Sequence, residues 1–180
     1  MKATGIVRRI DDLGRIVIPK EIRRTFRIRE GDPLEIFTDT DGGIIFRKYS
    51  PVGEMMPAAA QYAEVLNRVS GMPVLMCDCD HVIAAAGVPK KEYLERRVTA
   101  DLEELIHARK NFAAGKTDRS AVTPVEGINQ AAAVLCPIVA AGDVAGAVVL
   151  LKRSPDDMPG ETEVKLAQAS AAFLGKQLEG

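Results

Sequence analysis

The sequence has few aromatic residues and no Trp. Aromatic side chains make up 4% of the 180 residues, so we expect a core built from aliphatic side chains. The three cysteines cannot all pair within one chain, which argues against a small secreted domain framed by disulfides. The first residues also lack the apolar segment of a signal peptide. We therefore expect a cytoplasmic protein.

Long apolar runs are scarce as well, and a single stretch needs discussion. Residues 131–151 are long enough to cross a bilayer and contain one charged residue, Asp143. Pro137 and the Gly142-Asp143 pair divide this stretch into two short apolar runs. Such runs on either side of a Gly-Asp turn are typical of a buried β-hairpin. We predict strands over residues 134–140 and 144–151, and no membrane contact.

No recognisable set of catalytic residues is present. Cys77, Cys79 and His81 alternate, so on one strand their side chains would face the same way, as in a thiolate–imidazole metal site. Their spacing is not that of a known zinc module, and Asp78-Cys79-Asp80 is typical of a turn. We favour the alternative of structural cysteines. We predict that the protein is not an enzyme and that it has no catalytic residue, metal or cofactor.

Positive charge is concentrated at one end of the chain. The formal net charge is −1 overall, yet residues 1–29 hold nine basic and three acidic residues, a net charge of +6. Seven of the nine are Arg, whose forked guanidinium suits phosphates and guanine edges. This distribution indicates a surface that binds a polyanion. The alternative is a solvated charged surface without a ligand.

The first 50 residues predict four short strands and one short helix. The strands are expected over residues 4–10, 15–18, 34–38 and 44–48, and the helix over residues 20–26, with Pro19 at its first position. Such a unit buries too little apolar surface to be stable alone, and its strands leave sheet edges open. Two copies paired into one closed barrel would remove both problems. The sequence therefore predicts an obligate homodimer.

Four motifs in this segment resemble the AbrB-type DNA-binding domain. They are TGIVR at residues 4–8, DLGRIVIP at 12–19, EIRR at 21–24 and GDPLEI at 31–36. Phe26 departs from the pattern, since Leu is usual there. The resemblance implies a swapped-hairpin β-barrel formed by two chains, and a dimer that binds double-stranded DNA.

The resemblance also implies which residues contact DNA. The family's DNA-binding arginines fall on Arg8, Arg15, Arg23 and Arg24, and charge and position add Lys2 and Arg9. Each arginine has a structural alternative. Arg8 and Arg15 could pair with Asp11 or Asp12 across the first hairpin, and Arg23 and Arg24 could solubilise a short helix.

The rest of the chain predicts a second, larger domain. We expect residues 1–50 to form the AbrB-type domain, 51–56 a linker and 57–180 the second domain. Its expected elements are a helix over 57–70, strands over 74–77 and 82–86, helices over 90–97 and 100–111, a strand over 120–125, the hairpin described above and a helix over 161–178. This order resembles a GAF domain, a ligand-sensing fold, so the fold class is α+β, with an antiparallel sheet flanked by helices.

Two further expectations follow from this resemblance. An unknown small molecule would lie between the central sheet and residues 87–130, in a mainly apolar pocket. The helices over 57–70 and 161–178 would pair across dimers and give a homotetramer.

The whole arrangement resembles transcription regulators of spore-forming bacteria. It implies a sequence-specific DNA-binding activator or repressor of sporulation genes, whose C-terminal domain senses a small molecule, drives assembly or does both. The alternative is an antitoxin-like module that uses the same barrel to bind a protein partner. Antitoxin tails are short and flexible, whereas residues 51–180 have the pattern of a folded domain.

Overall fold

A computed structural model of the chain describes residues 4–54, 56–115 and 121–179. Contacts within the chain divide it into two compact units, Met1–Tyr49 and Ser50–Gly180. Within these described ranges, the first unit contains one helix and a two-stranded sheet, and the second contains a five-stranded sheet with helices on both faces.

The N-terminal unit contains helix α1 (Lys20–Thr25) and the antiparallel strands β1 (Leu34–Thr38) and β2 (Ile44–Lys48). Both strands have the predicted bounds. Their turn is organised by Asp39, whose carboxylate accepts hydrogen bonds from the backbone N–H groups of Gly43 at 2.6 Å and Asp41 at 3.1 Å. Helix α1 begins directly after Pro19, which occupies the N-cap and not the first helical position as predicted, and it ends one residue earlier than predicted.

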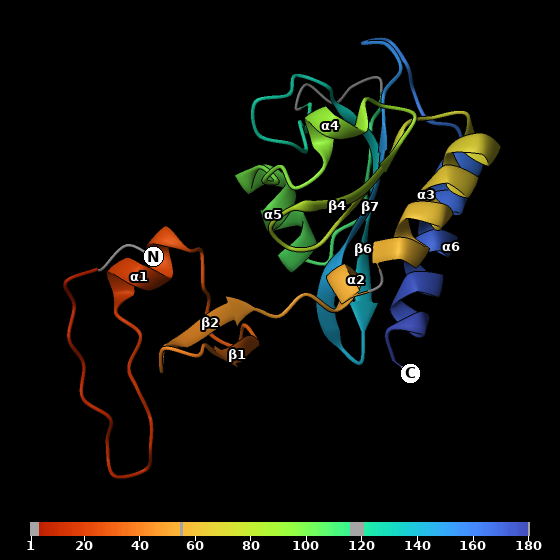
Figure 1. Cartoon of the computed structure of the whole chain (residues 1–180). Coiled ribbons are helices and arrows are strands. Elements are labelled where there is room, and N and C mark those ends of the chain that lie inside the picture. Colours follow the sequence, from red (N-terminus) through yellow and green to blue (C-terminus); the bar gives the residue numbers. More distant parts are fainter. Residues whose placement is uncertain (1–3, 55, 116–120, 180) are drawn as a thin grey trace. The chain divides into compact units, whose positions relative to one another are not determined.

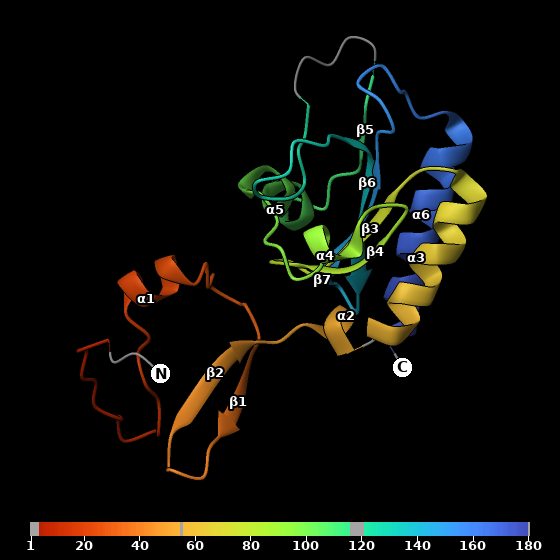
Figure 2. The same ribbon diagram turned by 45° about the horizontal axis from the view of Figure 1, so that its top comes forward.

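The prediction of strands over residues 4–10 and 15–18 is wrong for the single chain. Among the described residues 4–19 none belongs to a strand, and Figures 1 and 2 show this segment as a long loop that leads back to α1. A strand requires a hydrogen-bonded neighbour. The two strands of this unit pair with each other, and the loop pairs with neither.

The C-terminal unit is built on an antiparallel sheet with the strand order β4-β3-β7-β6-β5. The strands are β3 (Val74–Cys77), β4 (Val82–Ala86), β5 (Phe112–Ala113), β6 (Ala132–Ala140) and β7 (Asp143–Leu151). Strands β3 and β4 have the predicted bounds, and β6 and β7 begin slightly earlier than predicted. In the part of the chain that the structure describes, no helix is long and apolar enough to cross a bilayer.

Helices cover both faces of this sheet (Figure 1). Helices α3 (Met56–Ser70) and α6 (Glu161–Gln177) pack on one face, and α4 (Lys90–Tyr93) and α5 (Ala100–His107) lie on the other. Each side has its own buried cluster of aliphatic side chains. The central strands are therefore buried on both faces, which explains their unbroken apolar sequences.

Three predictions in this unit need correction. Helix α4 ends at Tyr93 rather than at residue 97, and α5 ends at His107 rather than at residue 111. Glu95 and Arg109, just beyond the two helices, have positive φ values of 62° and 54°, which an α-helix does not allow. The strand expected over residues 120–125 is reduced, among the described residues, to one bridge between Val98 and Val125.

The segment expected as a linker, residues 51–56, is regular in its described part up to residue 54. It contains helix α2 (Pro51–Glu54), and the Val52 side chain is 1% exposed, within the core between the sheet and α3. The Ser50 hydroxyl accepts a hydrogen bond from the Gly53 N–H at 3.1 Å and so caps this helix. Regular structure therefore begins directly after the N-terminal unit.

Candidate nucleic-acid interface

The loop of the N-terminal unit is organised by Asp11. Its carboxylate accepts hydrogen bonds from the backbone N–H groups of Leu13 at 3.1 Å and Arg15 at 2.7 Å, and from Arg15 Nε at 2.8 Å. These bonds, the backbone one to Arg15 foremost, lower the pKa of Asp11. The Arg15 side chain is 69% exposed. It is therefore fixed relative to the turn and still presented to solvent.

The other predicted arginines are also exposed. Arg8 and Arg9 lie before the turn at Asp11, and Arg8 Nη1 donates to the carbonyl of its neighbour Val7 at 3.2 Å. Arg23 and Arg24 lie on α1. Lys2 lies outside the described residues.

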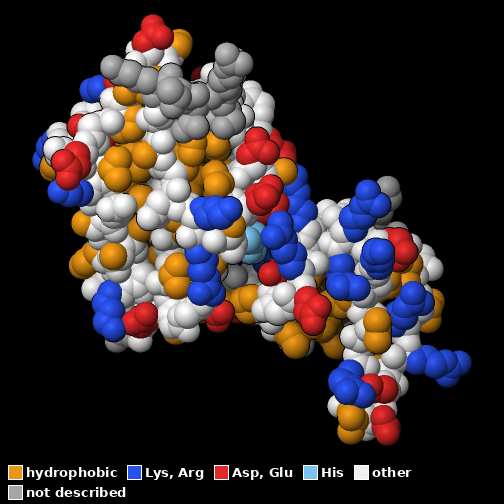
Figure 3. All heavy atoms as spheres, turned by 180° about the vertical axis from the view of Figure 1, so that it is seen from behind, with side chains coloured by type: hydrophobic (Ala, Val, Ile, Leu, Met, Phe, Trp, Pro, Cys, Tyr) orange, Lys and Arg blue, Asp and Glu red, His pale blue; other side chains and the backbone are white. Residues whose placement is uncertain are grey.

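The arrangement places these arginines in two groups. Arg8, Arg9 and Arg15 share one loop, and Arg23 and Arg24 share the helix that follows it. Figure 3 shows basic side chains spread over this unit, with hydrophobic ones among them. Of the structural alternatives, the Arg15–Asp11 pair is present. A pair of this kind on an exposed surface contributes little to stability, so it is compatible with a binding role for Arg15.

The described part of the N-terminal unit has no core of its own. None of the described residues 4–49 is buried, and this segment holds eleven of the sixteen large hydrophobic side chains that the described chain exposes. The β1–β2 hairpin shows the pattern most clearly. Ile36 and Phe46 are paired across the strands and lie on the same face, and they are 63% and 42% exposed. An exposed apolar surface of this extent marks an interaction site.

A second exposed apolar surface lies on α3 and α6 of the C-terminal unit. The rings of Tyr62 and Phe173 stack with their centroids 5.5 Å apart. Val65, Val69 and Phe173 are 53%, 64% and 48% exposed. We call these four residues the α3–α6 face. Ala59 and Leu66, also on α3, are in contrast buried.

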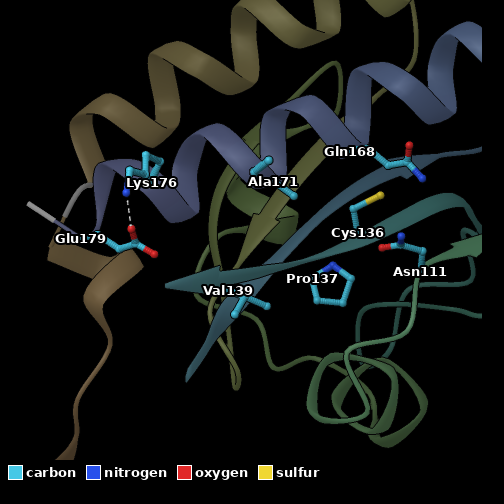
Figure 4. A pocket seen from close by; sticks show the side chains of 9 residues that line it. Asn111, Cys136, Pro137, Val139, Gln168, Ala171, Lys176 and Glu179 are labelled. Atoms are coloured by element: carbon cyan, nitrogen blue, oxygen red, sulfur yellow. Dashed lines mark hydrogen bonds and ion pairs between the residues drawn. The ribbon is translucent and has the colours of Figure 1, made fainter. Parts of the chain in front are cut away.

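Two of the pockets in the described part of the C-terminal unit bear on the predicted ligand site. The first, of about 420 Å³, lies between β6 and α6 (Figure 4) and is lined by Cys136, Pro137, Gln168 and Lys176, among others. Burial raises the pKa of the Cys136 thiol to about 11, so this thiol is protonated at neutral pH. The second, of about 360 Å³, lies beside α5 and includes Leu105 and Val122.

The remaining cysteines have structural surroundings. Cys77 is fully buried in the cluster that faces α4 and α5, and burial raises the pKa of its thiol strongly. The Cys79 thiol donates to the carbonyl of Val144 at 3.7 Å. Among the described residues, no three His, Cys, Asp or Glu side chains are grouped as a metal site requires.

Sequence comparisons relate both units to known proteins. The family described as "Stage V sporulation protein T C-terminal, transcription factor" matches residues 54–179, and the family "Antidote-toxin recognition MazE, bacterial antitoxin" matches residues 7–54. Stage V sporulation protein T of Bacillus subtilis (strain 168) is 50% identical, over 99% of both chains. The transition state regulatory protein AbrB of the same organism is 61% identical over 51 residues, which are 28% of this chain and 52% of AbrB.

A solved structure supports the fold of the C-terminal unit. The GAF domain from Acinetobacter phosphoenolpyruvate-protein phosphotransferase superposes with a TM-score of 0.55 at 14% identity, over 73% of this chain and 83% of that domain. At this identity the likeness concerns the fold alone, and it confirms the predicted GAF-like architecture. The family match and the whole-chain identity lead to one conclusion: this chain belongs to the stage V sporulation protein T family of transcription factors.

Proposed function

We propose that the N-terminal unit pairs with a second copy of itself into a swapped-hairpin barrel, and that this dimer binds double-stranded DNA to regulate sporulation genes. Because its target is chromosomal DNA, the protein acts in the cytoplasm. The observation that carries the proposal is the combination of exposed arginines with a unit in which none of the described residues 4–49 is buried. An isolated unit of this size and composition would be unstable.

A second chain would solve this problem physically. The apolar face of the β1–β2 hairpin, with Ile36 and Phe46, would be buried against the partner. The loop limbs that carry Arg8 and Arg15 would gain the neighbouring strands that they lack in one chain. Pairing would also double the number of arginines on one surface.

We assign DNA contacts to Arg8, Arg15, Arg23 and Arg24 and, from charge and position alone, to Lys2 and Arg9. Most protein–DNA hydrogen bonds go to the backbone, so several of these residues position the dimer while others read base edges. Arg15 is the best oriented, since Asp11 holds its Nε at 2.8 Å and leaves most of the side chain exposed.

The salt dependence of binding tests this assignment. Eight arginines in a dimer, each meeting a phosphate, would give log K against log salt a slope of about −7, from about −0.9 per contact. The measurement uses a duplex that the protein selects from a random library. Arg23→Ala should flatten the slope by about 2 because a dimer carries the change twice, whereas Arg68→Ala, on α3, should leave it unchanged. A wild-type slope shallower than about −2 would contradict the proposed docking.

We assign assembly to the α3–α6 face. Exposed Val65, Val69 and Phe173, beside the stacked Tyr62, form a helical seam of the kind that pairs helices across chains. With barrel dimers at the other end of the chain, this pairing gives a homotetramer.

We place the proposed small-molecule site in the pocket beside α5, because its lining residues fall within the segment 87–130, although they come from α5 and neighbouring loops and not from the sheet against which the sequence predicts the ligand. Elsewhere on that side of the sheet, buried residues such as Tyr93, Leu102 and Ile106 pack closely in the described structure. A shift of thermal unfolding in a screen of small apolar metabolites would support this site, and Leu105→Trp should abolish the shift.

An antitoxin role rests on the match to residues 7–54 alone. The same residues resemble AbrB, and the relative that matches the whole chain is a sporulation protein. Regulation of transcription is therefore better supported. A small protein that co-purifies in equimolar amount with the full chain and displaces DNA would favour the antitoxin role instead.

A further inference from the structure

The connection between the two units is short, and both of its ends are anchored. Tyr49, the last residue of the N-terminal unit, donates its N–H to the carbonyl of Pro33 at 3.0 Å and so extends the β1–β2 ladder. Ser50, the next residue, donates its hydroxyl to Asp78 Oδ2 at 2.9 Å. Consecutive residues are therefore held by different units.

Asp78 is itself firmly placed in the turn between β3 and β4. Its Oδ1 accepts hydrogen bonds from the N–H groups of Asp80 at 2.7 Å and His81 at 2.6 Å, and its own N–H donates to the His81 carbonyl at 3.0 Å. Hydrogen bonds to an ionised carboxylate are stronger than neutral ones. The acceptor for Ser50 is thus a rigid part of the sheet.

The residues after Ser50 fit this anchor. Ser50 caps α2, and Pro51 occupies the first helical position, where its missing N–H costs nothing. At Gly53 a Cβ atom would lie 2.8 Å from Ser50 Oγ, so a larger residue would disturb the cap. The next side chain that anchors the chain to the core is Val52, at 1% exposure.

We propose that Ser50 and Asp78 are positioning residues, which set the length of free chain between the DNA-binding unit and the C-terminal unit. Without the hydroxyl, the chain would be free as far as Val52, two residues further on. Two extended residues add about 7 Å of reach. The consequence for DNA rests on the proposed function and the proposed tetramer: barrel dimers on short connections favour two binding sites at a defined spacing, and longer connections relax this preference.

Limited proteolysis of the full chain tests the connection without DNA. Trypsin cleaves after Lys48, and a protease needs several residues of free chain around the bond that it cuts. Ser50→Ala should be cleaved there about tenfold faster, as expected for the loss of a hydrogen bond to a charged group. Ser50→Thr keeps a hydroxyl and should restore the wild-type rate.

Ser70→Ala is the matched control. The Ser70 hydroxyl likewise donates once, to the Leu66 carbonyl at 2.7 Å, and accepts once, from the Met72 N–H at 3.2 Å, at the far end of α3. Ser70→Ala should leave the rate of cleavage after Lys48 unchanged. Asp78→Ala should accelerate cleavage like Ser50→Ala, and the double variant should add nothing to either.

Hydrogen exchange separates a local change from unfolding. In Ser50→Ala the Gly53 amide should lose protection while the amides of β7 keep theirs. Equal cleavage rates for wild type and Ser50→Ala, with β7 intact, would overturn the proposal. So would faster cleavage in Ser50→Ala and Ser70→Ala alike.

The DNA measurement uses duplexes with two selected sites, separated by whole or half turns. The wild-type protein should bind more tightly at one of these two spacings than at the other. Ser50→Ala should lose this preference, while its affinity for a single site changes less than about twofold. An unchanged preference in Ser50→Ala would overturn the positioning role. If no duplex is bound selectively, the proposed function fails, and the proteolysis still decides the role of Ser50 and Asp78.

Discussion

The two units of this chain differ in where their apolar side chains lie. In the C-terminal unit, strands such as β3 and β4 are buried along their whole length, and helices cover both faces of the sheet. In the N-terminal unit no described residue is buried, although the unit contains many Ile, Val and Phe residues.

This difference separates a unit that carries its own core from a unit that needs a second chain to complete one. The arginines predicted to contact DNA belong to the unit without buried residues in its described part. A barrel shared by two chains presents the same basic surface twice, which suits the two-fold symmetry of many DNA sites.

A charge on the apolar face of the hairpin should have the largest effect. Ile36→Lys would place an unpaired ammonium in the proposed barrel core, at a cost of several kcal/mol. We expect DNA affinity to fall more than about 100-fold, with the melting transition of the C-terminal unit unchanged. Thr40→Lys, an equal charge change at the exposed turn, should bind DNA normally. If Ile36→Lys also bound normally, this face would be solvent-exposed in the active protein.

A cavity in the C-terminal core should come next. Leu150 is completely buried on β7, so Leu150→Ala should lower the free energy of unfolding of this unit by about 2–5 kcal/mol. Urea denaturation followed by circular dichroism measures it. Leu94 is exposed, so Leu94→Ala should lower this free energy of unfolding by less than about 1 kcal/mol. Equal costs would mean that the sheet is not the core of this unit.

The contrast between the units also shows what the sequence can predict. The bounds of β1, β2, β3 and β4 were predicted correctly because turn-forming residues separate each pair, and the structure shows Asp39 and Asp78 organising those turns. The ends of α4 and α5 were not predicted correctly, because Glu95 and Arg109 adopt positive φ values. Such values usually occur at glycine, and neither position is a glycine.

Other features depend on partners that a single sequence does not contain. Alternation in residues 4–18 predicted strands, but strand pairing there needs a neighbour that this chain does not supply. The arginines were found through motifs, whereas the exposure of Val65 and Phe173 depends on how α3 and α6 lie against the sheet. The role of Ser50 was missed, although Ser followed by Pro is a helix-start signal.

Truncation on the α3–α6 face should have an intermediate effect. Phe173 is 48% exposed and stacks on Tyr62, and aromatic residues dominate protein interfaces. Phe173→Ala should raise the constant for dissociation of the proposed tetramer into dimers about tenfold, measured by light scattering at several concentrations. Gln168→Ala, on another side of α6, is the control. A tetramer unaffected by Phe173→Ala would show that assembly uses a different surface.

The smallest effect should come from the ion pair after β7. Arg153 donates from Nε and Nη2 to the Asp157 carboxylate at 2.7 and 2.8 Å, and this side-chain bonding lowers the pKa of Asp157 to about 2. Because the pKa of Asp157 is lower in the folded state, its ionised carboxylate stabilises the fold at pH values above its ordinary pKa near 4. This contribution is lost as the pH falls towards 2. Asp157→Asn should therefore lower the free energy of unfolding by about 1 kcal/mol at pH 7 and hardly at all at pH 2. Urea denaturation at both pH values measures this, with exposed Asp156→Asn as control.

Because the Arg153–Asp157 pair lies in the unit with its own core, the loss of stability in Asp157→Asn should be the same at all protein concentrations. Any loss of stability in the N-terminal unit should depend on concentration.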